Sequence, residues 1–411
     1  MFRFQENDRM EIRLSCGFGC GKSGSPRTDC PSEVQRKESQ GEEMKYILQV
    51  FTGSWNQANV QPEEIIRTIE ETASLIPVEK VIIGWNTDPS VYRKTGQFLH
   101  ESGIRMLLWL PVFAEIGEIA GQDEALDLFG KNVPSPAGTG AENFRFGCIS
   151  SRNNTRLVMD VFEKFFSGCG FDGVFLDRIR SQSFVSGIPG VLSCGCERCR
   201  KAFLERGSDL DQVRRRYEES GDAFFDAETF PMNGEFILRD PLAQRFFDVK
   251  EELIADAVNE IVCDFRNRGM TVGLDLFAPV VSRFVGQKYS KIAKNADFIK
   301  PMLYRRTEAP AGIGYEYSLF RKCLPGAKGW RNQLPGDRAF LNTQLEAIRS
   351  APCPGYPGIE INYDEQLVRT DADYLKESLD AIRAYGFEGA ALCWDIMRAP
   401  PSHIQSIRDM G

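Results

Sequence analysis

The chain has 411 residues, of which 42% are hydrophobic and 26% are charged. This is the usage of a globular protein that is long enough to bury a large core without disulfides. The formal net charge is −8, and no segment carries the basic stripe that a nucleic-acid partner would require. No apolar run reaches the length of a membrane span, so a membrane partner is not expected either.

Residues 1–43 differ from the rest of the chain. They are rich in Gly, Ser, Arg, Glu and Gln and have almost no periodic apolar pattern, which predicts a disordered N-terminal extension. They also lack the apolar stretch of a signal peptide. The 12 cysteines of the chain show no regular disulfide spacing. Together these features favour a reducing, cytoplasmic location, and nothing in the pattern specifies an oligomeric state.

From residue 44 onward, short apolar runs alternate with helical patterns, as expected for a parallel sheet with crossover helices. The runs are apolar throughout, which is typical of strands that are buried on both faces. Eight strands are predicted, at 46–51, 80–85, 105–112, 173–177, 271–277, 297–303, 358–362 and 390–394.

Helices are expected between these strands, because apolar residues recur there at helical spacing. The predicted helices span 62–75, 89–102, 152–166, 241–268, 371–385 and 402–410. Two connections, 113–151 and 178–240, are too long to be simple turns. The pattern therefore predicts an α/β fold, a (β/α)8 TIM barrel over 44–411 with insertions after strands three and four. Both insertions follow the carboxyl ends of strands, where barrels build their sites.

Several predicted strands end in polar or aromatic residues. A charge inside an apolar strand is costly unless it is paired or functional. One interpretation is a salt-bridge network, for example Lys300 with Asp275 or Glu360. Because polar residues recur at so many strand ends, a binding site is the better explanation for the set. The predicted substrate-binding residues are Trp85, Asn86, Trp109, Arg178, Asp275, Lys300 and Tyr304.

Three carboxylates at strand ends are candidates for catalysis. Asp177 ends strand four beside Arg178, whose charge would keep the carboxylate ionised. Glu360 lies between two isoleucines, an apolar setting that suits a general acid. Asp395, after strand eight, is the substitute for either. Cleavage of a glycosidic bond needs two carboxylates in unlike environments, so we predict Asp177 as nucleophile or base and Glu360 as acid.

A cluster of cysteines lies in the second insertion. Cys194, Cys196 and Cys199 form a C-x-C-x2-C pattern, and thiolates at such spacing suit a tetrahedral zinc ion. A closed structural site needs a fourth ligand, for which Cys148 is the first choice and Cys169 the second. The alternative is a set of free thiols. Because the cluster lies in an insertion, a structural Zn²⁺ is predicted and no cofactor is expected for catalysis.

These motifs resemble those of barrel glycoside hydrolases. The segment 170–177 and the arginines after it resemble the fourth-strand signature of uncharacterised glycosidase-like barrels and of the family 114 polygalactosaminidases. That resemblance implies a catalytic role for Asp177. The cysteine cluster, with one cysteine about 45 residues upstream, resembles the zinc site of family 42 β-galactosidases. Family 42 enzymes carry glutamates at the ends of strands four and seven, whereas strand four of this chain ends in the shorter Asp177.

The sequence thus predicts a glycoside hydrolase that acts on an oligosaccharide or another small molecule through paired carboxylates. Two other classes stay open. One is a non-catalytic carbohydrate-binding barrel. The other is a lyase or aldolase in which Lys300 forms a Schiff base, which would require a lysine with a depressed pKa.

Overall fold

The computed structural model describes residues 43–133 and 145–410. The chain divides into two contact units, Met1–Gly41 and Glu42–Gly411, and all described residues lie in the second. The extension predicted for residues 1–43 therefore falls outside the described part, except for its last residue. Among the described helices, none combines the length and apolar character needed to cross a bilayer.

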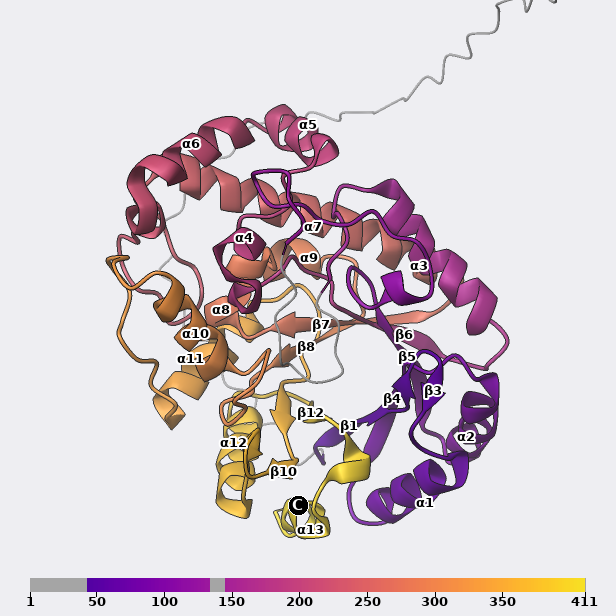
Figure 1. Ribbon diagram of the computed structural model, residues 1–411. Helices are drawn as coiled ribbons and strands as arrows, with labels where there is room; N and C mark the ends of the chain where they lie inside the picture. The colour runs from indigo at the N-terminus through magenta and orange to yellow at the C-terminus, as the bar shows by residue number, and fades with distance from the viewer. Residues whose placement is uncertain (1–42, 134–144, 411) are drawn as a thin grey trace, which may run out of the picture. The chain divides into compact units, whose positions relative to one another are not determined.

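Eight parallel strands close into a barrel at the centre of the second unit, and helices surround it (Figure 1). The predicted α/β TIM barrel is confirmed, and each of the eight predicted strands has a counterpart. Around the ring, β1 is followed by β12, β9, β8, β7, β6, β5 and β4. The strands are β1 (Lys45–Phe51), β4 (Val78–Gly84), β5 (Arg105–Pro111), β6 (Gly173–Asp177), β7 (Thr271–Phe277), β8 (Phe298–Met302), β9 (Gly358–Glu360) and β12 (Gly389–Cys393).

The predicted helices are also present, and capping residues set where several of them begin. The carboxylate of Asp88 accepts from the Ser90 amide at the start of α2, and Asp240 caps the long α7 in the same way. Proline follows each of these caps, in the first helical position that it favours. The six helices are α1 (Pro62–Ala73), α2 (Pro89–Glu101), α3 (Arg152–Phe165), α7 (Pro241–Asn267), α12 (Ala372–Ala384) and α13 (Pro401–Arg408).

Further short elements decorate the barrel. After β6 the chain forms α4 (Gly187–Val191), α5 (Glu197–Glu205) and α6 (Leu210–Ser220), and both α5 and α6 pack on α7. The sequence analysis missed α10 and α11 between β8 and β9. Apart from short 3-10 turns, the remaining described elements are α8 (Pro279–Ser282), α9 (Tyr289–Ile292), α10 (Ile313–Cys323), α11 (Arg338–Arg349) and two hairpins, β2–β3 (Gly53–Ser54, Gln57–Ala58) and β10–β11 (Tyr363–Asp364, Val368–Arg369).

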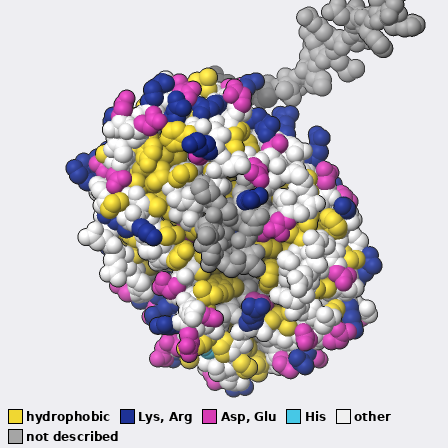
Figure 2. All heavy atoms as spheres, viewed as in Figure 1, with side chains coloured by type: hydrophobic (Ala, Val, Ile, Leu, Met, Phe, Trp, Pro, Cys, Tyr) yellow, Lys and Arg dark blue, Asp and Glu magenta, His cyan; other side chains and the backbone are white. Residues whose placement is uncertain are grey.

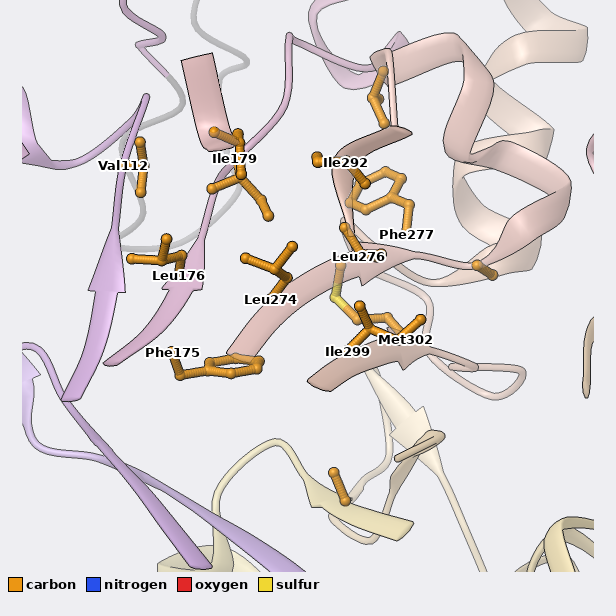
Figure 3. Packing of buried hydrophobic residues seen from close by; sticks show 14 of the residues in the cluster. Val112, Phe175, Leu176, Ile179, Leu274, Leu276, Phe277, Ile292, Ile299 and Met302 are labelled. Atoms are coloured by element: carbon orange, nitrogen blue, oxygen red, sulfur yellow. The ribbon is translucent and has the colours of Figure 1, made fainter. Parts of the chain in front are cut away.

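Neighbouring strands bury their side chains in register. Leu176 pairs with Leu274, and Leu274 pairs with Ile299, so these residues form one row across β6, β7 and β8 (Figure 3). The alternate residues on β6 and β8, Phe175 and Phe298, stack with ring centroids 6.1 Å apart. Because side chains alternate between the two faces of a strand, Asp177, Asp275 and Lys300, each one residue further along its strand, lie on the same face as Phe175 and Phe298.

Close packing inside the barrel leaves no room for a side chain at Gly273 on β7. A methyl group there would meet the Phe298 ring at 2.2 Å. We expect Gly273→Ala to lower the free energy of unfolding by about 1–3 kcal/mol, as overpacking does. The matched control is Gly314→Ala on α10, which meets nothing within 4 Å and should be neutral or slightly stabilising. Urea denaturation of both variants checks this, and equal midpoints would contradict it.

Candidate active site at the carboxyl ends of the strands

Asp177 ends β6, and its carboxylate is held from two sides. Trp109 of β5 donates from Nε1 to Oδ2 at 2.9 Å, and the backbone amide of Arg178 donates to Oδ1 at 2.5 Å. Arg178 adopts a left-handed backbone with φ 55°, which costs a non-glycine residue about 1–2 kcal/mol. The side chain of Asp177 is 12% exposed. Asp177 is thus a fixed carboxylate at a strained strand end, with a small part of its surface open.

A charged pair lies beside Asp177. Asp275 of β7 and Lys300 of β8 are register partners, and their Oδ2 and Nζ atoms are 2.9 Å apart. The Lys300 ammonium also donates to the Tyr304 hydroxyl at 3.0 Å and to Gln49 of β1 at 3.4 Å. This pair corresponds to the salt-bridge interpretation of these residues, and Lys300 pairs with Asp275 rather than with Glu360.

Burial and charge shift the pKa of both partners of this pair. Burial raises the pKa of Asp275 to about 7, while the Lys300 ammonium opposes that rise. For Lys300, burial alone would lower the pKa, but the nearby carboxylate of Asp275 raises it above its ordinary value. The lysine is therefore held as an ammonium ion at neutral pH.

Aromatic rings line the neighbouring strand ends. The Trp85 ring contacts Trp109 edge-on, with centroids 5.6 Å apart, and Phe51 of β1 packs edge-on against both. The Arg178 guanidinium lies 5.8 Å from the Trp85 ring centroid. Within the described part of the chain, the buried Nε1 of Trp85 has no hydrogen-bond partner. Two of the predicted substrate-binding aromatics are therefore brought next to Asp177.

Asp395 lies across the ring from Asp177. It follows β12, which is separated from β6 by three strands in either direction. Its Oδ1 accepts from the amides of Phe51 at 3.4 Å and Met397 at 3.2 Å. Its side chain is 10% exposed, and burial raises the pKa of Asp395 above its usual range. Phe51 links the two regions, because its amide contacts Asp395 while its ring contacts Trp109.

Glu360 at the end of β9 is fully enclosed, with 0% exposure. Its Oε1 accepts from the Arg306 amide at 2.6 Å and the Thr307 hydroxyl at 3.3 Å, and its Oε2 accepts from the Tyr374 hydroxyl. Burial raises the pKa of Glu360, although the Tyr374 and Arg306 donors favour its ionised form. None of these contacts joins Glu360 to Asp177.

Variants of Glu360 can measure how much the fold depends on these contacts. Glu360→Leu leaves three buried donors without an acceptor and should lower the free energy of unfolding by about 3 kcal/mol at pH 7. Glu360→Gln keeps an acceptor and should cost much less. Because the folded pKa is raised, the folded state binds a proton more tightly than the unfolded chain, and ionisation removes stability as pH rises. The advantage of the wild type over Glu360→Gln should therefore shrink in urea titrations as the pH rises above the unfolded carboxyl pKa of about 4.3. A constant advantage would contradict this.

Asn86 has a different environment from the other predicted binding residues. Its Nδ2 donates to the Ser54 carbonyl at 2.9 Å, and its Oδ1 accepts from the Asp88 amide at 2.8 Å. These bonds join the loop after β4 to the β2–β3 hairpin, and Asn86 is 2% exposed. They give Asn86 a role in holding these loops.

Two residues near the site were missed by sequence reasoning. Glu115, in the loop after β5, is buried and has a positive φ of 63°, and its Oε1 lies 3.8 Å from NH1 of Arg178. Nothing in the local sequence marked it. Gln49 is the one polar side chain within the apolar run 46–51, a signal that could have led to it.

The four predicted cysteines come together. The ligand atoms of Cys148, Cys194, Cys196 and Cys199 all lie within 4.8 Å of one another, so the cluster could hold a metal ion. Sγ of Cys148 is 3.4 Å from that of Cys196 and 3.5 Å from that of Cys199. A tetrahedral ion with bonds of about 2.3 Å needs sulfurs about 3.8 Å apart, so the spacing fits after a small expansion. The alternative ligand, Cys169, instead contacts the Phe165 carbonyl.

On the face of the molecule in Figure 2, basic and acidic side chains are interspersed rather than gathered by sign. Hydrophobic side chains also reach the surface there in several patches.

Comparisons with known proteins bear on the fold. No family model matches the sequence, and no curated protein matches it. Among solved structures, the glycoside hydrolase domain of PgaB (BpsB) from Bordetella bronchiseptica superimposes with a TM-score of 0.57 at 15% identity, covering 89% of this chain and 98% of that domain. Alpha-L-fucosidase isoenzyme 2 from Paenibacillus thiaminolyticus gives 0.54 at 10% identity, covering 90% of this chain. This chain spans about half of the fucosidase, 49%.

At such identities the likeness establishes the fold alone. The protein is a (β/α)8 barrel of the architecture that these two glycoside hydrolases share. The resemblance to barrel glycoside hydrolases is thereby supported at the level of the fold. The finer resemblance to families 42 and 114 stays a prediction.

Proposed function

We infer that the protein is a glycoside hydrolase that cleaves an oligosaccharide with Asp177 as nucleophile or base. The observation that carries this inference is the environment of Asp177. It is a partly exposed carboxylate at a strand end, oriented by Trp109 and by the Arg178 amide, with two tryptophans beside it. The Trp109 ring is partly exposed, and an exposed aromatic face can pack on the C–H side of a sugar ring. Glycoside hydrolases are also found on this barrel in the two solved structures named above, which is consistent with this reaction class.

For the acid, Asp395 is the better candidate. It lies on the opposite side of the ring from Asp177, keeps 10% of its side chain exposed, and has a pKa raised by burial. A raised pKa lets a carboxyl donate its proton to the leaving oxygen near neutral pH. Glu360, the acid predicted from sequence, is more deeply enclosed and would act only if the Tyr374 contact opened.

Schiff-base chemistry at Lys300 is not favoured. A lysine attacks a carbonyl as the neutral amine, whereas burial next to Asp275 holds Lys300 as an ammonium with a raised pKa. Borohydride in the presence of small ketones and aldehydes should therefore leave Lys300 unmodified.

For the cysteine cluster, we propose a structural Zn²⁺ bound by Cys148, Cys194, Cys196 and Cys199. The donor set is all sulfur, as in closed structural zinc sites. The ion would join the segment after β5 to the segment after β6, and it has no part in the bond cleavage.

Hydrolysis can be tested with a panel of reducing-end-labelled oligosaccharides of neutral, amino and acidic sugars, incubated in ¹⁸O-water. Mass spectrometry should show shortened products with one ¹⁸O atom for each cleaved bond. The matched control is Asp264→Asn, which changes an exposed carboxylate on α7 and should cleave as the wild type does. Binding of a sugar without cleavage would overturn the proposal in favour of a non-catalytic carbohydrate-binding barrel.

A further inference from the structure

Three charged residues form a row on adjacent strands at the depth of the candidate site. Leu176 pairs with Leu274, so the next residues along β6 and β7 are Asp177 and Asp275. Asp275 in turn pairs with Lys300 on β8. Parallel register places these three side chains on one face, and the charge of Asp177 acts on both of the others.

Asp275 and Lys300 have almost no surface with which to touch a sugar. Their side chains are 3% and 1% exposed, whereas that of Asp177 is 12% exposed. Within the described residues, the buried Oδ1 of Asp275 has no hydrogen-bond partner. A buried carboxylate oxygen without a donor is costly, so the fold maintains an arrangement that stability alone does not explain.

We propose that Asp275 and Lys300 are positioning residues that set the charge of Asp177, with the Lys300 ammonium stabilising the two carboxylates together. The inference rests on the proposed function, because Asp177 must be the reacting carboxylate for its charge to matter. Sequence reasoning placed both residues in contact with substrate. In this proposal they act through Asp177 instead.

Other titratable or charged groups among the described residues also lie around the row. Tyr289 of α9 and Cys393 of β12 are buried groups whose pKa is raised by burial, as is that of Tyr304 after β8. Because the pKa of each is raised, these three groups stay protonated and neutral at neutral pH. They therefore add no negative charge that would offset the Lys300 ammonium. Arg178, Glu115 and Glu360 are further charged residues near the row.

Removing Asp275 and removing Lys300 should shift the pH dependence of the rate in opposite directions. Asp275→Asn deletes the carboxylate charge and keeps the Lys300 ammonium, so the acid limb of the rate profile should move to lower pH. Lys300→Met deletes the positive charge and leaves two carboxylates side by side, so the acid limb should move to higher pH. A purely structural role would lower the rate without opposite shifts.

Carboxyl ¹³C NMR of aspartate-labelled protein tests the coupling without any substrate. The Asp275 signal, identified by its loss in Asp275→Asn, should titrate near pH 7. Its midpoint should rise in Lys300→Met and fall in Asp177→Asn, in each case by about one unit. Asp264→Asn should leave it unchanged. If Lys300→Met fails to fold, the comparison of the wild type with Asp177→Asn still shows whether Asp177 shifts the Asp275 midpoint.

An Asp275 midpoint that is the same in wild type and Asp177→Asn would overturn this inference. So would rate profiles of Asp275→Asn and Lys300→Met that shift in the same direction. Failure of the proposed function gives a different result, because the wild type would then cleave no sugar while the NMR coupling could still be measured.

Discussion

Replacing Asp177 by Asn should lower turnover of the cleaved oligosaccharide by about 10³-fold or more, the scale expected when a central catalytic carboxylate is removed. The amide has nearly the same shape, and its single oxygen can accept one of the two hydrogen bonds that the carboxylate accepts, from Trp109 Nε1 or from the Arg178 amide. It lacks the negative charge needed to attack the sugar or to activate water. The melting temperature should therefore stay within a few degrees of that of the wild type.

The matched control is Trp109→Phe, which keeps the Asp177 carboxylate but removes its indole donor. This variant should lose much less activity than Asp177→Asn, because orientation is weakened while the charge remains. Initial rates and calorimetry on the same preparations give both quantities. If Asp177→Asn keeps more than about a tenth of the wild-type rate, Asp177 is not the reacting group.

Cys196→Ser should strongly destabilise the protein. Structural zinc sites couple metal binding to folding, and loss of a metal site belongs to the small class of changes that cost about 4 kcal/mol or more. For a domain of this size, that corresponds to a fall in melting temperature of about 10 °C. Elemental analysis should find about one zinc per wild-type chain, and markedly less in the variant.

Cys263→Ser is the matched control, because Cys263 is an exposed cysteine on α7 outside the cluster. It should change stability by less than about 0.5 kcal/mol. A Cys196→Ser protein that melts together with Cys263→Ser would mean that the four thiols contribute no metal-dependent stability.

The barrel was predictable because its strands are short apolar runs that contrast sharply with what surrounds them. Helices with clear start signals, such as α2 with its Asp88 cap and the proline after it, were also predicted. The helices α10 and α11 were missed because glycines and prolines break up the region between β8 and β9. Within this stretch α11 does carry a local signal that could have identified it, because Asp337 caps its start and buried apolar residues follow at helical spacing.

The candidate site could be proposed from the sequence only where a residue stood out on its own strand. Asp177 and the pair of Asp275 with Lys300 are charges inside apolar runs, so their strand positions marked them. What each residue touches depends on neighbours distant in sequence. Glu360 has apolar neighbours in sequence, yet it is enclosed by the hydroxyl of Tyr374 and the amide of Arg306, and no local pattern reveals that.

The cysteine cluster has a consequence for how this barrel can vary. Loops on a barrel ordinarily change independently, because each is anchored only to its own strand. Here Cys148 comes from the segment after β5 and the other three cysteines from the segment after β6, and the Leu126 amide also donates to Cys194 at 3.4 Å. Near the starts of these segments, Glu115 of one lies 3.8 Å from Arg178 of the other, and Arg178 adjoins Asp177. An insertion or deletion in one must therefore be matched in the other, so the two loops should be inherited and exchanged as one module.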